Sequence, residues 1–587
     1  MGNKDTNIPA TPSVVPRNRL KVLRWDGWGY IDTSFPCDEN GDITVTSDRY
    51  PFSTAHIPDE IRKFALNALN FDTFNGVGIC ESQPHPTTFP EAIINQEFMN
   101  EIKKLKIPFS KEGPDRLFRG HGQGFCEIIN LRERTFGRIP DLVTWPSCHD
   151  DVVQLVQLAS KLNVVLVPFG GGTNVTRALE CSVDEKRMIN RVLWVDNVNL
   201  MACCEAGIMG QDLRAALKKH NLNMGHEPDS IEFSTLGGWV ATRASGMKKN
   251  QYGNIEDLVV HVKFVTPSGV LEKSNLAPRV SCGPDLHQLA LGSEGTLGVI
   301  TEVTFKVRPI PEITEFDSFR CQPASLRLVD NEQFKMGQMF KEKLTWFGSV
   351  IDSLKMFYVT KYKGIDLDTM CVAIAVFEGE ATDVAISKAK LTAIASKFDG
   401  FSGGSKNGER GYNLTFIIAY LRDVLLAHSV LSESIETSLP WDRVALVYRN
   451  VNTVVKQKCE EFGIKHFLVS GRVTQVYDTG ACIYFYVAYN CEGLDHVMEN
   501  FEEIETAARD EILRCGGSLS HHHGIGKLRS NWYPSQVSPV GVAVYRAVKQ
   551  ALDPNNVFAS RNLLPHNPHD NIICNTNVKN GSLCNLK

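Results

Sequence analysis

Three features are missing from this sequence of 587 residues, and each absence excludes a class of protein. No run of about 18 apolar residues occurs, so we expect no helix that spans a bilayer. The 62 Lys and Arg residues nearly balance the 67 Asp and Glu residues, and we expect no nucleic-acid partner. The 16 Cys residues form no C-x-x-C repeat, which excludes a disulfide scaffold and a structural zinc site.

What the sequence does contain is an alternation of helix and strand patterns that divides the chain into four parts. Residues 1–105 mix Trp, Gly and Pro around one helical stretch and predict an irregular N-terminal layer. In residues 106–311, a strand, an amphipathic helix and a buried strand at 164–167 lead into a glycine loop, which is a nucleotide-binding layout. Pro309 and Pro311 mark a boundary. Residues 312–515 form a helix-and-strand domain, and residues 516–587 form a C-terminal segment.

The glycine loop is the first of four segments rich in small and hydroxyl residues. Residues 168–174 read PFGGGTN, and glycines there let a backbone approach a ligand and offer N–H groups to an anion. The loop matches neither the G-x-G-x-x-G fingerprint nor the Walker A motif, and alone it would indicate a structural turn. Further segments lie at 227–238, 242–246 and 292–298.

The four segments together resemble the flavin-binding domain of the vanillyl-alcohol oxidase and p-cresol methylhydroxylase superfamily. The resemblance implies an α+β fold, with a two-subdomain FAD-binding domain, an α/β cap domain for substrate and the C-terminal segment packed near the flavin. No His or Cys stands in residues 168–174, so we expect non-covalent FAD. The implied cofactor-binding residues are Pro168, Phe169, Gly170, Gly171, Gly172, Thr173, Asn174, Asp229, Ser230, Ser234, Thr235, Thr242, Arg243, Ala244, Ser245, Glu294, Gly295, Thr296, Leu297, Gly298, Val299 and Ile300.

The most unusual string is SLSHHHGIGK at residues 518–527. Three readings stay open for it: a surface loop, a metal site in which His521 and His523 share an ion with a third ligand, and an acid/base centre. Consecutive side chains of an extended segment point to alternate faces, which disfavours convergence on one ion. Imidazole gives and takes protons near neutral pH, so we favour the acid/base reading and predict no metal.

With these strings in view, the chain resembles the alkyldihydroxyacetonephosphate synthase family of flavoenzymes. The resemblance runs from the string WDGWGY at 25–30 to RNLL at 561–564, and includes HEPDS at 226–230 and RASGMKKN at 243–250. It implies an enzyme of ether-lipid biosynthesis. Such an enzyme exchanges the acyl group of acyl-dihydroxyacetone phosphate for a long-chain fatty alcohol, giving alkyl-dihydroxyacetone phosphate and a fatty acid. The implied route passes through a covalent adduct at flavin N5, with no net redox change.

The same resemblance assigns roles to residues outside the glycine segments. His521, His522 and His523 match the family's catalytic histidines, and Tyr484 matches a catalytic tyrosine on a strand. Arg422 matches an arginine that holds the departing carboxylate, which suits a bidentate guanidinium. The residues implied as important for activity are Arg327, Ser560, Arg561 and Asn562, and the candidates for binding the substrate phosphate are Lys248, Lys249 and Lys527.

Partners and location follow from the resemblance and from the apolar substrates. Fatty chains do not stay in water, so we expect a peripheral membrane protein. The family implies the lumenal side of the peroxisomal membrane, contact with the preceding acyltransferase, and, as the commonest assembly, a homodimer. The C-terminus, CNLK, carries no Ser-Lys-Leu signal. Two alternatives stay open: a flavin D-2-hydroxy-acid dehydrogenase of the same fold and a non-catalytic flavoprotein scaffold.

Overall fold

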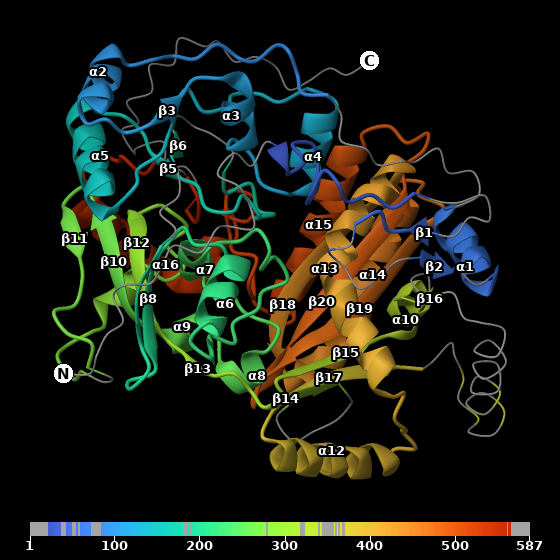
Figure 1. Cartoon of the computed structure of the whole chain (residues 1–587). Coiled ribbons are helices and arrows are strands. Elements are labelled where there is room, and N and C mark those ends of the chain that lie inside the picture. Colours follow the sequence, from blue (N-terminus) through green and yellow to red (C-terminus); the bar gives the residue numbers. More distant parts are fainter. Residues whose placement is uncertain are drawn as a thin grey trace.

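A computed structural model describes the fold of most of the chain (Figure 1). The described residues are 21–36, 43–47, 49, 54–56, 59–71, 84–179, 185–186, 191–277, 280–316, 323–337, 341–342, 357, 361, 364, 366, 370–559 and 561–564.

A small sheet and two helices build the first part of the nucleotide-binding region. Its strand order is β3-β4-β6-β5, and β6 is parallel to both β4 and β5. The apolar positions of α5 pack against α2 in one core, as the helical spacing predicts. The strand expected at 164–167 is paired only over its last residue and Pro168, because the partner strand β6 has just two residues. The bounds are α2 Gln96–Lys104, β3 Phe109–Ser110, β4 Val143–Thr144, α5 His149–Leu162, β5 Val167–Pro168 and β6 Glu185–Lys186.

An antiparallel five-stranded sheet forms the second part of this region, with strand order β11-β10-β12-β8-β7. Helices α6, α7 and α9 pack on it, and the C-terminal helix α16 reaches the same core through Tyr545, Val548 and Leu552 (Figure 1). Three of the strands were predicted from apolar runs. The bounds are β7 Val192–Asp196, β8 Met201–Glu205, α6 Gly210–Lys218, α7 Leu236–Thr242, α9 Ile255–Leu258, β10 Val259–Thr266, β11 Gly269–Leu271, β12 Val299–Lys306 and α16 Tyr533–Leu552.

The cap region is an antiparallel six-stranded sheet with order β14-β17-β15-β19-β20-β18. Alternate residues of β20, such as Phe485 and Val487, are buried in one core with α14 and α15. The period of two predicts this, since it places Tyr484 and Tyr486 on the opposite side. The bounds are β14 Ile313–Phe316, β15 Ser325–Val329, β17 Val372–Gly379, β18 Val430–Pro440, α14 Trp441–Glu461, β19 Phe467–Val476, β20 Gly480–Asn490 and α15 Val497–Arg514.

Three neighbouring strands of the cap place one polar side chain each in a single row. Tyr484 of β20 lies opposite Glu436 of β18 and opposite Arg472 of β19. Residues directly opposite each other project on the same side of a sheet, so this row points away from α14 and α15. Arg327 of β15 projects on that side too, because Val329, two residues further along, lies opposite Arg472.

The N-terminal layer packs on the long helix α13. The backbone N–H of Trp28 donates to Asp423 at 2.7 Å, and that of Tyr30 donates to Tyr420 at 3.0 Å. The apolar run at 414–421 predicts a buried strand or a short core helix, and in the structure it lies within the 23 residues of α13. The remaining bounds are β1 Ile43–Thr44, β2 Thr54–His56, α1 Asp59–Leu69, α3 Gly113–Phe118, α4 Phe125–Arg132, β9 Leu222–Asn223, α8 Lys249–Tyr252, β13 Arg308–Pro309, α10 Asn331–Gly337, β16 Lys341–Glu342, α12 Ala381–Ser396 and α13 Ser405–Ala427.

No helix among the described residues combines the length and the apolar character needed to cross a bilayer.

Candidate active site

A large cavity opens where the glycine segments meet the cap sheet. It encloses about 1890 Å³ of empty space, counting its open mouth. The space within it that is open to small molecules is about 330 Å³, at the lower end of the roughly 300–1,000 Å³ of ordinary small-molecule pockets. Its wall is formed by residues 168–174, 228–230 and 234–235 and by parts of 237–245 and 293–300. From the cap sheet and the C-terminal segment, Tyr484, His522, His523 and Asn562 also line it.

The glycine loop fits a tightly bound cofactor because it has no space for side chains. A Cβ on Gly171 would lie 2.1 Å from the carbonyl oxygen of Phe233, and one on Gly170 would lie 2.6 Å from Thr235 Oγ1. Gly172 has φ of +73°, which L side chains rarely adopt. The loop therefore lies directly against the segment around residue 234, and both line the same cavity.

Nineteen of the 22 predicted cofactor-binding residues line this cavity. The other three are Arg243, Thr296 and Leu297. Arg243 forms an ion pair with Glu256 at 3.3 Å, and Leu297 is fully buried in the core of the five-stranded sheet. Thr296 Oγ1 donates to the Ser293 carbonyl oxygen at 2.6 Å. These three residues support the lining segment rather than forming its surface.

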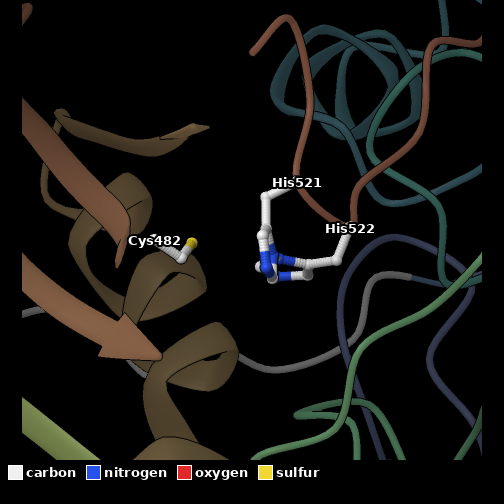
Figure 2. A group of neighbouring side chains, drawn as sticks. All are labelled: Cys482, His521 and His522. Carbon is white, nitrogen blue, oxygen red and sulfur yellow. The ribbon is translucent and has the colours of Figure 1, made fainter. Parts of the chain in front are cut away.

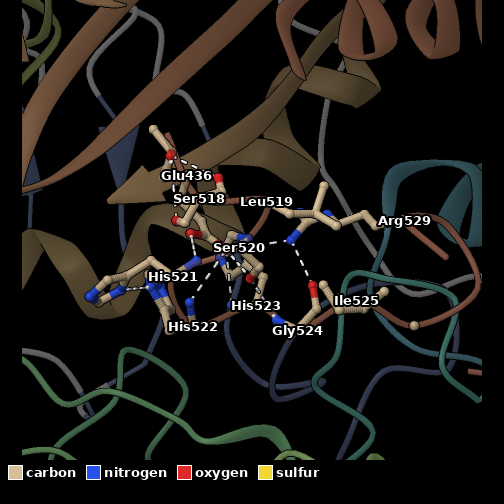
Figure 3. Close-up of polar contacts among 12 residues, drawn as sticks. Glu436, Ser518, Leu519, Ser520, His521, His522, His523, Gly524, Ile525 and Arg529 are labelled. Carbon is tan, nitrogen blue, oxygen red and sulfur yellow. Dashed lines mark hydrogen bonds and ion pairs between the residues drawn. The ribbon is translucent and has the colours of Figure 1, made fainter. Parts of the chain in front are cut away.

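Residues 518–527, which carry the three histidines and are called the histidine loop below, surround the carboxylate of Glu436 (Figure 3). Glu436 is fully buried and accepts hydrogen bonds from the backbone N–H groups of His521, of His522 at 3.4 Å and of His523 at 3.1 Å. It also accepts from Ser520 Oγ at 2.7 Å and from Arg529 Nη1 at 3.4 Å. Burial acts to raise the pKa of the Glu436 carboxyl, but its charged surroundings, with the Arg529 guanidinium at 3.4 Å, hold that pKa well below its ordinary value. Glu436 is therefore a fixed anion at the centre of the loop.

Glu294 holds the other end of the same loop. Its two carboxylate oxygens accept the backbone N–H groups of Ile525 and Gly526, each at 2.7 Å. Glu294 also lines the cavity. Burial raises the pKa of this carboxyl, although the two backbone N–H groups act to lower it. Glu294 therefore joins the predicted cofactor segment to the histidine loop.

Tyr484, His523 and Glu436 form a chain of contacts that begins at the cavity wall. Tyr484 Oη lies 2.5 Å from His523 Nε2, and His523 Nδ1 lies 3.8 Å from a Glu436 oxygen. Burial, and then Tyr486, raises the pKa of Tyr484 well above its ordinary value. Burial, and then His522, lowers the pKa of His523 well below its ordinary value. The phenol therefore donates to a neutral imidazole, whose Nδ1 carries the hydrogen and faces Glu436.

The remaining two histidines extend this network, His522 along the cavity wall and His521 away from it. Their Nδ1 atoms lie 2.8 Å apart, and His521 Nε2 lies 2.6 Å from Tyr477 Oη. Burial, and then His522, lowers the pKa of His521 to about 3. His522 lines the cavity and stacks on Tyr484 with ring centroids 5.6 Å apart, whereas His521 does not line it.

Cys482, His521 and His522 form a group whose donor atoms lie within 4.8 Å of one another (Figure 2). The set differs from the His521 and His523 pair considered from the sequence. A metal binds the thiolate, and burial, followed by Glu436, raises the pKa of the Cys482 thiol far above its ordinary value. The donors therefore fit a metal poorly, and the absence of a metal stays a prediction.

Arg327 and Arg472 are buried on the cap face beside Tyr484. They are 3% and 7% exposed, and each lies within 4 Å of Asp229, at 3.9 and 3.8 Å. The Arg472 guanidinium carbon lies 5.2 Å from the ring centroids of both Tyr484 and Tyr486. Because Asp229 and Tyr484 line the cavity, these two cations lie directly behind its wall.

The other predicted residues occupy different places. Arg422 does not line the cavity; its Nη1 donates to the Gln123 carbonyl oxygen at 2.5 Å, and its Nη2 donates to Asp423 at 3.3 Å. Asn562 lines the cavity and donates to the carbonyl oxygens of Ala178 and Glu294. Arg561 is exposed, with φ of +61°. Ser560 lies outside the described residues.

The lysines considered for the substrate phosphate have partners within the protein. Lys248 Nζ pairs with Glu227 at 2.9 Å and with Glu378 at 2.5 Å. Lys249 Nζ lies 3.3 Å from the ring centroid of Tyr477, and burial lowers its pKa to about 8. Lys527 Nζ donates to the carbonyl oxygens of Arg177 and Ala178. None of the three lines the cavity.

Sequence reasoning missed Glu436, Arg472 and Tyr477. The first two are charged residues inside long strands, where alternate residues are apolar, and that pattern was the available signal. A charge in such a strand is either solvated or functional, and only the strand register separates the two cases. Tyr477 carries no local signal, because it lies just after β19 and contacts His521, which is 44 residues away in the sequence.

Comparison with known proteins first defines the class of protein. A family model described as an FAD binding domain matches residues 140–275, and one described as the C-terminal domain of FAD linked oxidases matches residues 312–563. The solved structure of p-cresol methylhydroxylase shares the fold, with a TM-score of 0.59 at 13% identity over 81% of this chain and 99% of that chain. The protein is an FAD-linked flavoprotein of this α+β type, and the predicted fold class is confirmed.

Closer relatives then identify the family. The alkyldihydroxyacetonephosphate synthase of Caenorhabditis elegans is 46% identical over 579 residues, covering 94% of this chain and 96% of the relative. A solved alkyldihydroxyacetonephosphate synthase structure matches with a TM-score of 0.76 at 29% identity, covering 92% of this chain and 98% of that chain. The chain belongs to the alkyldihydroxyacetonephosphate synthase family, which confirms the resemblance stated from its strings.

Proposed function

We propose that this enzyme exchanges the acyl group of acyl-dihydroxyacetone phosphate for a long-chain fatty alcohol, releasing alkyl-dihydroxyacetone phosphate and a fatty acid. Family membership supports the reaction. The observation that carries the proposal within this chain is the chain of contacts through Tyr484, His523 and Glu436, which begins at the wall of the cavity that the predicted cofactor segments line. It offers a phenol and an imidazole to one reacting centre.

FAD, when bound, supplies an electrophilic ring nitrogen and an electron sink, which lets the exchange proceed without net oxidation. The chain's own residues handle the protons. Tyr484 Oη lies beside the cavity and relays a proton between an oxygen of the leaving or entering group and His523. His523 Nε2 accepts the hydrogen bond of that phenol and orients it. His522, stacked on Tyr484, is the second imidazole at the wall and takes a proton from substrate carbon C1.

The test is turnover by the purified yellow protein. Palmitoyl-dihydroxyacetone phosphate and radiolabelled hexadecanol are mixed with it, and labelled alkyl product and free palmitate are expected in equal amounts. The flavin should remain oxidised at the end. The rival dehydrogenase would instead leave reduced flavin after anaerobic mixing with a D-2-hydroxy acid. A non-catalytic scaffold would give neither result. Retained exchange in a protein carrying both His522→Ala and His523→Ala would refute the assignment of the site.

We also infer that the FAD is held non-covalently. Among the described residues, no Cys lines the cavity, and the two histidines that do are those with the proposed proton roles. Precipitation of the protein with acid should therefore release all of the yellow colour into the supernatant. Flavin that stays with the pellet would contradict this inference.

The proposals on location rest on the substrates and on the family. We propose a homodimer that lies on the lumenal face of the peroxisomal membrane, in contact with the preceding acyltransferase. Flotation with vesicles tests the membrane contact, sedimentation of the holoenzyme tests the dimer, and microscopy of the tagged full-length chain tests the organelle. Pull-down with that acyltransferase tests the remaining partner.

A further inference from the structure

We propose that Arg472, together with Arg327, binds the phosphate group of the three-carbon substrate. The inference rests on the proposed function and names the phosphate-binding residues of the same site. Its basis is a buried cation for which the described residues provide no hydrogen-bond acceptor.

Arg472 is the unusual member of the pair. A guanidinium carries five N–H donors, and a buried donor without an acceptor is costly. Arg472 is 7% exposed, and among the described residues its closest anion is Asp229, at 3.8 Å, which is beyond hydrogen-bonding distance. Its Nε is buried without any partner there. The aromatic rings of Tyr484 and Tyr486 flank the group but accept no conventional hydrogen bond.

Arg327 adds a second charge with unused donors. Its Nη1 donates to Thr415 Oγ1, while its Nε has no partner among the described residues and its Nη2 lies 3.9 Å from Asp229. The Asp229 carboxylate thus faces both guanidiniums but is too far from either to accept a hydrogen bond. Asp229 is 38% exposed through its side chain and lines the cavity, so an anion entering the cavity meets this cluster.

The identity of the anion follows from the reaction. The phosphate is present in the substrate and in the product, whereas the fatty carboxylate exists only after the acyl group has left. A permanent pair of buried cations suits the anion that is always present. Phosphate also offers enough oxygen atoms for two guanidinium forks at once. The two arginines lie on the Tyr484 side of the cap sheet, which places the phosphate next to the proton donor.

The alternative cations in the site are already engaged. Arg422 donates to a carbonyl oxygen and to Asp423, and Lys248 pairs with two glutamates. Arg472, 5.2 Å from the Tyr484 ring centroid, and Arg327 therefore supply unused donors on the Tyr484 side of the cap sheet.

The experiment compares ligand binding to holoenzyme carrying Arg472→Met with binding to the wild type. Isothermal titration with dihydroxyacetone phosphate should show affinity weakened at least about 30-fold, because one partner of a buried charged contact is removed. Palmitate affinity should stay within about twofold. In the exchange assay the KM for the acyl phosphate should rise much more than kcat falls. The matched control is Arg443→Met, an exposed arginine of α14, which should leave both affinities unchanged.

Each outcome decides one question. Wild-type affinity for dihydroxyacetone phosphate in Arg472→Met overturns the inference, and so does a loss confined to palmitate, which would assign the pair to the carboxylate. If the wild type binds dihydroxyacetone phosphate through Arg472 but catalyses no exchange, the anion site stands and the proposed function fails. Should Arg472→Met lose its flavin, Arg472→Lys decides instead: it keeps the charge but loses the fork, so an affinity equal to the wild type's overturns the inference.

Discussion

At the scale of single residues, the site depends on an unusual pairing of protonation states. The phenol of Tyr484 is held protonated and the imidazole of His523 is held neutral, and they share a 2.5 Å contact. The fixed anion Glu436 lies behind the imidazole. A proton that passes from Tyr484 to His523 makes an imidazolium that faces a carboxylate, which stabilises it.

This arrangement predicts that Tyr484 and His523 act as a unit. Tyr484→Phe and His523→Gln should each lower kcat/KM by about 100-fold or more, the usual contribution of a positioned proton donor. The double variant should be little slower than either single variant, since each substitution already breaks the pair. Exchange rates of the four proteins at equal flavin content measure this. If the loss of kcat/KM in the double variant equals the product of the two single losses, the two residues act independently.

Glu436 provides a second prediction at this scale. Glu436→Gln keeps the shape but replaces an acceptor oxygen by an NH₂ group, so at least one donor of the histidine loop loses its acceptor. Breaking a buried charged contact costs roughly 3–5 kcal/mol, and we expect a loss of that order in the free energy of unfolding. Activity should fall at least about 100-fold. Denaturant titration and the exchange assay measure the two effects, with exposed Glu461→Gln as the control. Unchanged activity would mean that the loop does not depend on Glu436.

The histidines and Tyr484 could be predicted from the sequence because a rare string and a family motif mark them. Glu436 and Arg472 could not, because their role comes from the register that places residues 436, 472 and 484 side by side. A register shift of one residue would turn either charge to the helical side of the sheet, and a shift of two residues would move it away from Tyr484. No local pattern fixes that register.

At the scale of elements, the glycine loop is the most constrained segment of the cavity. Gly171→Ala places a methyl group 2.1 Å from the Phe233 carbonyl oxygen, and the loop must move away from its neighbour. Overpacking of this kind costs about 1–3 kcal/mol and would open the wall that holds the cofactor. We expect most of the flavin to be lost on purification, which the ratio of flavin to protein absorbance measures. Gly137→Ala, with nothing within 4 Å of its Cβ, should keep its flavin.

Helices and long strands were the predictable elements. The periods of α5, α15 and β20 each extend over enough residues to mark one buried face. The two-residue strands of the four-stranded sheet have no such period, since their positions depend on partners far along the chain. The apolar stretch at 414–421 illustrates the limit, because an apolar run of eight residues fits a strand or a helix equally well.

At the scale of the whole molecule, buried neutral histidines couple stability to pH. Burial lowers the pKa of His226 and His521 to about 3 and of His287 to about 4, and it lowers the pKa of His523 as well. Below about pH 6.5 these histidines bind protons in the unfolded chain but not in the folded protein. The free energy of unfolding therefore falls as the pH falls. Each contributes about 1 kcal/mol between pH 7 and pH 5.5. Buried Glu294, whose pKa is raised, acts in the opposite sense.

His226 allows this to be measured on one group. It is 3% exposed, its ring centroid lies 4.9 Å from that of Trp239 with the planes tilted by 59°, and neither ring nitrogen has a partner among the described residues. His226→Phe keeps the ring and removes the titration. We expect equal or higher stability at pH 7, and a loss between pH 7 and pH 5.5 that is about 1 kcal/mol smaller than in the wild type. Guanidinium unfolding at both pH values measures the difference. An unchanged difference would show that His226 is protonated or paired in the folded state.

The way the histidine loop is anchored has a consequence for how such enzymes diversify. Glu436 and Glu294 hold the loop mainly through main-chain N–H groups, which every residue except proline possesses. The path of the backbone is thus largely indifferent to which side chains it displays. Substitutions, natural or engineered, can therefore replace the imidazoles with other reactive groups while the loop keeps its backbone conformation, so that the same fold supports a different reaction.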